Sequence, residues 1–300
     1  MTSIKSFKSI AYWTLPPGIQ NTLQTIYRNK IRRQHINPEL TEIESAARKN
    51  SIFKNKHSGE RCFILATGPS IKEQDLSVLQ GELCIAVSHF FLHKDIKIIN
   101  PQYHILAPYH SPFNFKTLEK VFDGFNECYS DDTIYLFGHR IYDYSIFNFL
   151  KKYPERNRKN AYFINYSSSQ SLDENNYNEP QNWDISKSPF EIRTVVYIAI
   201  QVALYMGCKE IYLIGCDHDY LNDTNRITNH HFYKEEDGVS DAEHLSSFTT
   251  ERWFKEYYLR WKQYRLMGEY AKSQGCQIFN ATKGGMLDVF PRVKITDIAK

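Results

Sequence analysis

The chain has 300 residues, of which 42% are hydrophobic, 24% charged and 15% aromatic. This composition predicts a globular protein with one large domain or two small ones, and it excludes disorder as the main state. The longest apolar run, residues 195–206, is shorter than the roughly 20 residues that span a bilayer. The first residues also lack the apolar core and small-residue cleavage site of a secretory signal.

The cysteine and histidine spacings favour neither a disulfide framework nor a zinc site. The six cysteines form no C-x-x-C pair, and no H-x-x-H or H-E-x-x-H spacing occurs. We therefore expect reduced core cysteines, no zinc centre and a cytoplasmic protein.

Positive charge is concentrated at the start of the chain. Residues 1–38 contain six Lys or Arg and no acid, whereas the whole chain carries a net charge of only +3. Apolar and aromatic residues accompany these cations, which is typical of a helix lying on an anionic membrane surface. Packing on the rest of the protein, or on a second subunit in a homo-oligomer, is the alternative. Because the remaining chain is mildly acidic, we do not expect nucleic-acid binding.

We predict an amino-terminal arm and linker over residues 1–58 and a catalytic domain over residues 59–300. Short apolar runs predict buried strands, and longer segments predict helices from residue 71, over 190–206 and over 249–273. The strands are expected at residues 62–66, 83–87, 103–107, 134–137, 162–164, 210–214 and 277–280. This alternation predicts an α/β fold, a Rossmann-like and mostly parallel sheet with helices on both faces. In such sheets ligands bind beyond the carboxyl ends of the strands.

The first polar strand end is Thr67-Gly68-Pro69-Ser70. Gly68 allows a close backbone approach, Pro69 can begin a helix, and Ser70 with the helix amides can face an anion. A phosphate-binding turn is one interpretation, and a tight turn with a serine cap is the other.

A second polar strand end is Gly215-Cys216-Asp217-His218-Asp219. Asp217 and Asp219 have the spacing of a pair that binds a divalent ion on a nucleotide diphosphate. Asp217 can instead accept hydrogen bonds from a ribose or orient a loop. A third strand end contains Thr282 and Lys283, which either bind a phosphate or carboxylate or belong to a plain loop.

A long polar segment, residues 219–248, is predicted to be a lid. His230 and His231 are candidate general bases, with His244 as a third, because histidine titrates near neutral pH. Tyr233 can donate to a leaving phosphate. Solvated loop histidines are the alternative.

Two of these segments carry a family resemblance. Residues 67–73 and 203–217 resemble the bacterial sialyltransferases of glycosyltransferase family 42, and the related 6-hydroxymethylpterin pyrophosphokinase-like domain of motility accessory factors. The resemblance covers roughly residues 60–285. It implies a GT-A-like variant of the Rossmann-like fold, a CMP-linked nonulosonate donor and inverting transfer without a metal or other cofactor.

The resemblance also implies roles for individual residues. Gly68, Pro69 and Ser70 would hold the nucleotide, Tyr220 or Tyr233 its phosphate, and a lid histidine, His231 first, would be the base. Thr67 stands where the family usually has Asn, and Ser88 and Ala107 stand near its other nucleotide-contacting asparagines.

We therefore expect a glycosyltransferase of bacterial surface glycan biosynthesis, acting on a glycan or lipid-linked glycan acceptor at the inner face of the membrane. One alternative is a metal-dependent transferase of a nucleotide-diphosphate sugar or a pterin pyrophosphate that uses Asp217 and Asp219. The other is a non-catalytic, membrane-associated scaffold of a polysaccharide pathway.

Overall fold

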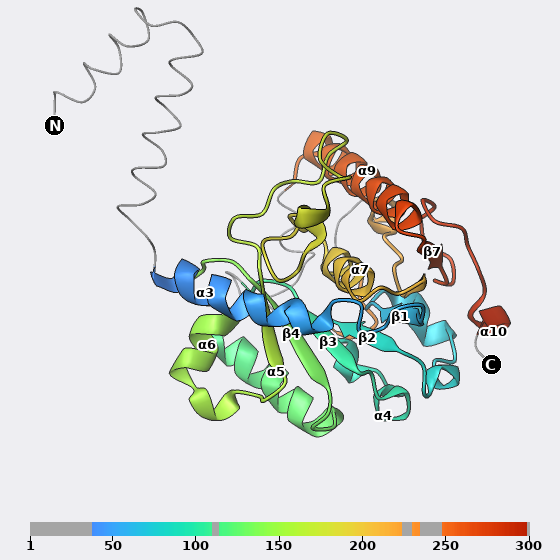
Figure 1. The fold of residues 1–300 in the computed structure, drawn as a ribbon. Coiled ribbons are helices and arrows are strands. Elements are labelled where there is room, and N and C mark those ends of the chain that lie inside the picture. Colours follow the sequence, from blue (N-terminus) through green and yellow to red (C-terminus); the bar gives the residue numbers. More distant parts are fainter. Residues whose placement is uncertain (1–37, 110–113, 224–229, 235–247, 299–300) are drawn as a thin grey trace, which may run out of the picture. The chain divides into compact units, whose positions relative to one another are not determined.

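The computed structural model describes residues 38–109, 114–223, 230–234 and 248–298 (Figure 1). The chain divides into two compact units, Met1–Glu42 and Ile43–Lys300. The second unit begins before the predicted boundary at residue 58, because the linker residues pack into its core. Phe53 is fully buried, and the Asn50 side-chain amide donates to the carbonyl oxygens of Phe163 (2.8 Å) and Ile185 (2.9 Å). The predicted basic arm lies almost wholly outside the described residues.

Seven parallel strands form one sheet in the order β5-β4-β3-β2-β1-β6-β7, which confirms the predicted fold class. The strands are β1 (Arg61–Leu65), β2 (Cys84–Val87), β3 (Tyr103–Leu106), β4 (Ile134–His139), β5 (Ala161–Asn165), β6 (Glu210–Ile214) and β7 (Gln277–Asn280). All seven match the predicted apolar runs to within two residues at each end, because strands buried on both faces of a sheet need continuous apolar sequence.

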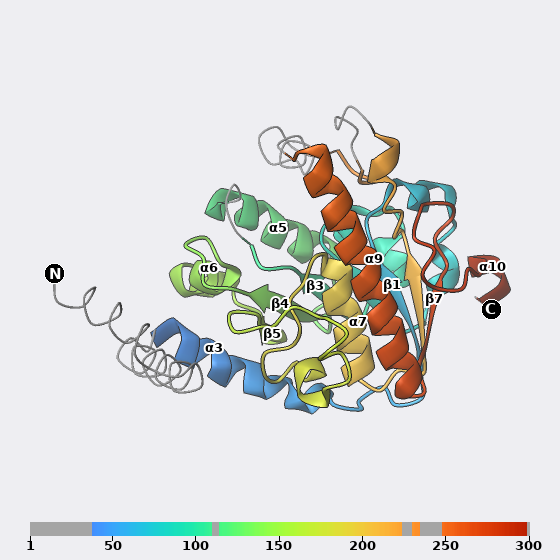
Figure 2. The same ribbon diagram turned by 90° about the horizontal axis from the view of Figure 1, so that it is seen from above.

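Helices cover both faces of the sheet (Figures 1 and 2). The α-helices are α3 (Pro38–Arg48), α4 (Ile96–Ile99), α5 (Phe115–Cys128), α6 (Ile146–Lys152), α7 (Val195–Tyr205), α9 (Thr250–Ser273) and α10 (Ile295–Ile298). Short 3-10 helices occupy η1 (Lys49–Phe53), η2 (Pro69–Glu73), η3 (Ser77–Leu79), η4 (Phe90–Leu92), η5 (Pro154–Arg156), η6 (Pro180–Trp183) and η7 (Tyr220–Asn222). No helix of the described residues is long and apolar enough to cross a bilayer.

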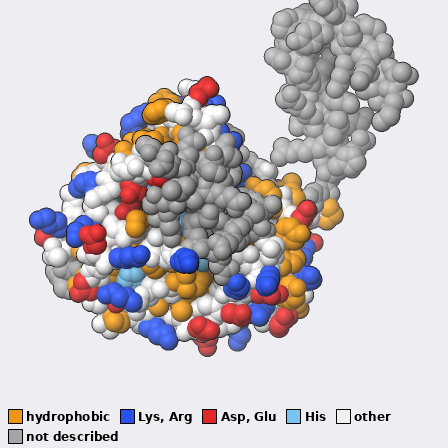
Figure 3. Space-filling view, turned by 180° about the vertical axis from the view of Figure 1, so that it is seen from behind, with side chains coloured by type: hydrophobic (Ala, Val, Ile, Leu, Met, Phe, Trp, Pro, Cys, Tyr) orange, Lys and Arg blue, Asp and Glu red, His pale blue; other side chains and the backbone are white. Residues whose placement is uncertain are grey.

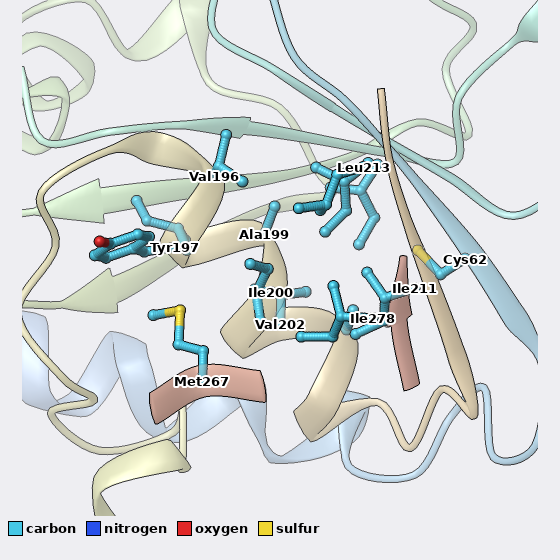
Figure 4. Close-up of a cluster of buried hydrophobic side chains, with 14 of the residues drawn as sticks. Cys62, Val196, Tyr197, Ala199, Ile200, Val202, Ile211, Leu213, Met267 and Ile278 are labelled. Carbon is cyan, nitrogen blue, oxygen red and sulfur yellow. The ribbon is translucent and has the colours of Figure 1, made fainter. Parts of the chain in front are cut away.

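The core has one layer on each face of the sheet, because side chains alternate along a strand. In β1, Cys62 and Ile64 pack in the layer that contains α7 and α9, whereas Phe63 and Leu65 pack in the layer with α4, α5 and α6. Figure 4 shows the first layer, where apolar side chains of α7 meet those of β1, β6, β7 and α9. As predicted from its uniformly apolar sequence, α7 is buried on all sides from Val196 to Ala203.

Two predicted helices differ from expectation. The segment expected to be helical from residue 71 forms only the five-residue 3-10 helix η2, and the chain is extended again at Gln74. The helix expected from residue 190 begins at Val195, where the Thr194 side chain accepts a hydrogen bond from the Val196 amide (3.5 Å) and caps it. Residues 190–194 before it are not helical, and Thr194 itself has an extended conformation.

The strand order places the two glycine-containing motifs side by side. The chain proceeds outward from β1 to β5 and then returns to β6, which pairs with β1 on its other edge, with Leu65 opposite Ile214. Crevices for ligands form at such a reversal of strand order, beyond the carboxyl ends of the strands. The fold therefore positions a site between the β1 and β6 ends.

Candidate active site

A cleft of about 980 Å³ opens at this edge of the sheet. Its wall combines the ends of β1, β2, β3 and β6 with parts of α5, the residues before α7, the described part of the predicted lid, and the first half of α9. The predicted site residues that line it are Thr67, Gly68, Ser88, Gly215, Asp217, Asp219, Tyr220, His230, His231 and Tyr233.

The β1 and β6 ends are joined by a carboxylate. The Ser70 amide and hydroxyl donate to the two carboxylate oxygens of Asp217, at 3.1 and 2.9 Å. Both Ser70 donors, predicted to face a phosphate, therefore bind a carboxylate of the chain itself, and neither Pro69 nor Ser70 lines the cleft. Likewise both Asp217 oxygens, predicted as possible metal ligands, accept hydrogen bonds from Ser70.

Close packing explains the glycines at this corner. A β-carbon at Gly68 would lie 1.8 Å from Oδ2 of Asp217 and 2.5 Å from the carbonyl oxygen of Gly215. Gly215 itself has φ of +70°, a conformation that residues with a side chain rarely adopt. Burial raises the pKa of Asp217 to about 6, although the hydrogen bonds from Ser70 act in the opposite direction.

The predicted lid is anchored at Thr67. The Phe232 amide donates to the Thr67 carbonyl oxygen (2.9 Å), and Nδ1 of His231 lies 2.9 Å from the Thr67 hydroxyl. The His231 ring stacks on Tyr233 with 5.0 Å between ring centroids and 8° between planes. These contacts fix the orientation of the imidazole on the cleft wall.

His230 points to two carboxylates instead. Its Nδ1 lies 3.6 Å from Asp219 and its Nε2 lies 3.5 Å from Asp223, while its ring meets Tyr220 edge to face at 4.5 Å. The two candidate bases therefore differ in environment: His230 lies between two carboxylates, whereas His231 lies against the Thr67 hydroxyl. His244 and most of the predicted lid lie outside the described residues.

The third polar strand end lies away from the cleft. Thr282 is buried and its hydroxyl accepts a hydrogen bond from the Cys216 amide (3.0 Å), so it supports the β6 end from behind. Lys283 pairs with Glu73 at 2.9 Å on the surface. Neither residue lines the cleft, because the loop after the edge strand β7 turns toward η2.

The structure adds cleft residues that the sequence interpretation did not single out. His89 lines the cleft with its ring 5.0 Å from that of Tyr233. Six cations also line the cleft against three carboxylates, Asp217, Asp219 and Glu256. The cations are Lys120, Arg140, Arg193, Lys234, Arg252 and Arg260. The four-residue spacing of Arg252, Glu256 and Arg260 was the available signal for the α9 members.

The cleft lining holds more cations than carboxylates. On the face seen in Figure 3, basic and acidic side chains are interspersed over the described surface. Within the cleft, Arg193 pairs with Glu256, and Arg140 pairs with Glu191 at 2.9 Å. The arrangement is suited to an anionic ligand, with an oriented imidazole at its side.

The family described as 6-hydroxymethylpterin diphosphokinase MptE-like matches residues 34–223, more than half of the chain, and the chain belongs to this family. The relationship expected from the motifs at residues 67–73 and 203–217 is thereby confirmed. A comparison with curated proteins finds no match.

Solved structures with a similar fold include two of a sialyltransferase. One is CST-II in complex with a trisaccharide acceptor and CMP, with 16% identity, a TM-score of 0.42, and coverage of 78% of this chain and 86% of that one. The other is CstII from Campylobacter jejuni with the substrate analogue CMP-3FNeuAc, at 16% identity and a TM-score of 0.40 over the same shares.

Proposed function

We propose that this protein is a glycosyltransferase that transfers a sugar from a nucleotide-linked donor, with a CMP-linked nonulosonate as the first candidate, to a glycan hydroxyl. The observation that carries the proposal is the cleft itself. It lies where the strand order reverses, it holds more cations than carboxylates, and it places an oriented histidine at its wall. The two sequence motifs, which resemble those of the sialyltransferases of glycosyltransferase family 42, support the same assignment.

The proposed chemistry gives His231 the role of general base. The imidazole takes the proton of the acceptor hydroxyl as that oxygen bonds to the donor carbon, and the bond from this carbon to the phosphate oxygen breaks. The nucleotide leaves as an anion. The cations of the cleft and the Tyr220 and Tyr233 hydroxyls stabilise that charge more in the transition state than in the bound donor.

Replacing His231 with Ala tests this role. We expect turnover to fall by about a hundredfold or more, as for loss of a general base, while donor affinity is retained. His230→Gln is the matched comparison, because both His230 nitrogens face carboxylates. Unchanged turnover in His231→Ala would remove this residue from the mechanism.

A nucleotide panel tests the donor class. Thermal shifts with CMP, CDP, UDP, GDP and ATP should show selective stabilisation by CMP, because a ligand that binds the folded state stabilises it. Stabilisation by another nucleotide would reassign the donor. No stabilisation by any member would favour the non-catalytic scaffold.

One further candidate function is a pyrophosphate transfer to a pterin, favoured by the description of the family. It would use a divalent ion at Asp217 and Asp219, where Asp217 also accepts two hydrogen bonds from Ser70. Activity that is lost on adding a chelator and restored by magnesium would support this candidate.

A further inference from the structure

One wall of the cleft is the first half of α9, and its charged residues form a stripe. Arg252, Glu256 and Arg260 are spaced by four residues and therefore lie on one side of the helix. The neighbouring side carries Trp253 and Tyr257, which are buried. Figure 2 shows α9 running along the sheet beside α7.

The carboxylate of this stripe pairs outside it, so neither of its two arginines has an ion-pair partner among the described residues, and of the two only Arg260 is half-buried. Glu256 pairs with Arg193, across from the residues that precede α7. Among the described residues, no carboxylate lies within ion-pair distance of Arg260, which is half-buried. Its Nε–H is buried and meets no acceptor in the described part of the chain.

Aromatic rings hold this guanidinium in place. Arg260 lies over the rings of Tyr220 and Tyr257, at 5.7 Å from each centroid. Such contacts offset part of the cost of desolvating an unpaired cation. The charge of Arg260 also affects His218, which lines the same cleft. Burial is the main cause that lowers the pKa of His218 to about 3, and the charge of Arg260 contributes to the same decrease.

A positioned guanidinium without a carboxylate partner has the geometry to accept one from a ligand, since its N–H groups match a carboxylate or phosphate in a bidentate pair. We propose that Arg260, flanked by Tyr220, is the anchor of an oxyanion subsite on the α9 wall. This subsite is separate from the Gly68–Ser70 turn, whose donors Asp217 already occupies. The group bound there is a carboxylate of an acidic sugar or a phosphate of a nucleotide. The inference rests on the proposed function in one respect only, that the substrate binds in this cleft.

Titration calorimetry on the full chain tests the subsite with matched pairs of probes. N-acetylneuraminate against its methyl ester reports a carboxylate, and CMP against cytidine reports a phosphate. We expect Arg260→Gln to weaken the charged member of one pair by about tenfold to a hundredfold, as for loss of a charge-assisted hydrogen bond, and to leave its uncharged partner unaffected. The affected pair identifies the source of the oxyanion.

Arg265→Gln is the control on the same helix, because Arg265 pairs with Glu174 and Glu269 outside the cleft. Arg260→Lys keeps the charge but not the two parallel N–H donors of the guanidinium and should show an intermediate loss. Thermal melts establish that each variant is folded.

Equal affinity of charged probes for Arg260→Gln and wild type, or no binding of any charged probe to wild type, would overturn the subsite. If N-acetylneuraminate binding depends on Arg260 but no nucleotide binds, the subsite stands and the proposed function fails. If the protein turns over a nucleotide sugar but Arg260→Gln changes no affinity, the proposed function stands and the subsite fails.

Discussion

Thr67 places a hydroxyl 2.9 Å from Nδ1 of His231. A hydroxyl both donates and accepts, so Thr67 can bond Nδ1 of His231 in the neutral ring and in the imidazolium that forms when the base takes a proton. The threonine is buried at the end of β1, so its position is set by the sheet. We infer that Thr67 positions the base.

Replacing Thr67 with Val tests this inference, because valine keeps the shape and removes the hydroxyl. We expect kcat to fall by about tenfold, because the hydrogen bond that orients the base is lost, and we expect little change in donor affinity. The nitrogen NMR shifts of the His231 ring should change as well, even without substrate. Thr67→Ser should restore both properties, whereas wild-type ring shifts in Thr67→Val would show that the contact has no orienting role.

Ser88 has a strained backbone conformation at the wall of the cleft. It follows β2, lines the cleft, and has φ of +52°, in the left-handed region that disfavours residues with a β-carbon. Strain of this kind concentrates at functional sites.

Glycine at position 88 should raise the free energy of unfolding by up to about 1 kcal/mol, because it removes the left-handed strain. The same change removes a side chain from the cleft, so nucleotide affinity should fall. Asn100→Gly is the control, since Asn100 has φ of +45° at the end of α4 and is not among the cleft residues. Urea titration and calorimetry on both variants measure the two effects. If Ser88→Gly is more stable than wild type but binds nucleotide equally well, the strain at this position has no role in binding.

At the scale of elements, the junction of β1 and β6 depends on one buried carboxylate. Asp217 receives two hydrogen bonds from Ser70, while its carbonyl oxygen accepts from the Met286 amide at 2.7 Å. The junction thus connects the turn after β1, the end of β6 and the loop after β7. Burial nevertheless raises the pKa of Asp217 to about 6, so the ionised carboxylate is costly there.

The sign of the resulting pH dependence follows from linkage. In the unfolded chain an aspartate titrates near pH 4, so between about pH 4 and 6 the folded state holds a proton that the unfolded state releases. The contribution of Asp217 to the free energy of unfolding should therefore decrease by about 2–3 kcal/mol as the pH rises from 4 to 7. Asp217→Asn should lack this decrease. Urea titrations of both proteins at several pH values within this range measure the difference, and parallel pH curves would contradict the raised pKa.

The elements also show how far the sequence alone leads. The strands were predictable because a doubly covered strand needs a continuous apolar run, whereas the pairing of β1 with β6 is known only from the structure. Contacts between side chains were not predictable in the same way. Nothing in the sequence indicates that Ser70 donates to Asp217 rather than to a ligand, because that depends on the register of β1 against β6. The cations of α9 do not stand out in the sequence, because aromatic residues dominate its pattern.

For the whole molecule, positive charge is concentrated in two places, and we expect ligand binding at one and membrane attachment at the other. The cleft gathers cations around a ligand site, while residues 1–38 carry +6 of a chain whose net charge is +3. A surface with mixed charges is not expected to bind anionic membranes by itself, so membrane attachment should depend on the arm. This remains a prediction from the sequence, with a second subunit as the alternative partner.

Substituting Gln for Arg28, Lys30, Arg32 and Arg33 in the full chain tests this task. Each basic residue near an anionic surface contributes about 1 kcal/mol, so four substitutions should weaken binding to phosphatidylserine vesicles by more than about a hundredfold. Gln at Lys72, Lys97, Lys187 and Lys272 removes the same charge elsewhere and should have little effect. Sedimentation with vesicles at low and physiological salt measures both variants, and the wild-type affinity should fall as salt rises. If the arm variant still sediments with vesicles but changes its oligomeric state in light scattering, the arm contacts a second subunit rather than lipid. Catalysis of nucleotide-sugar cleavage in solution should be equal in both variants, because the cleft lies wholly within Ile43–Lys300.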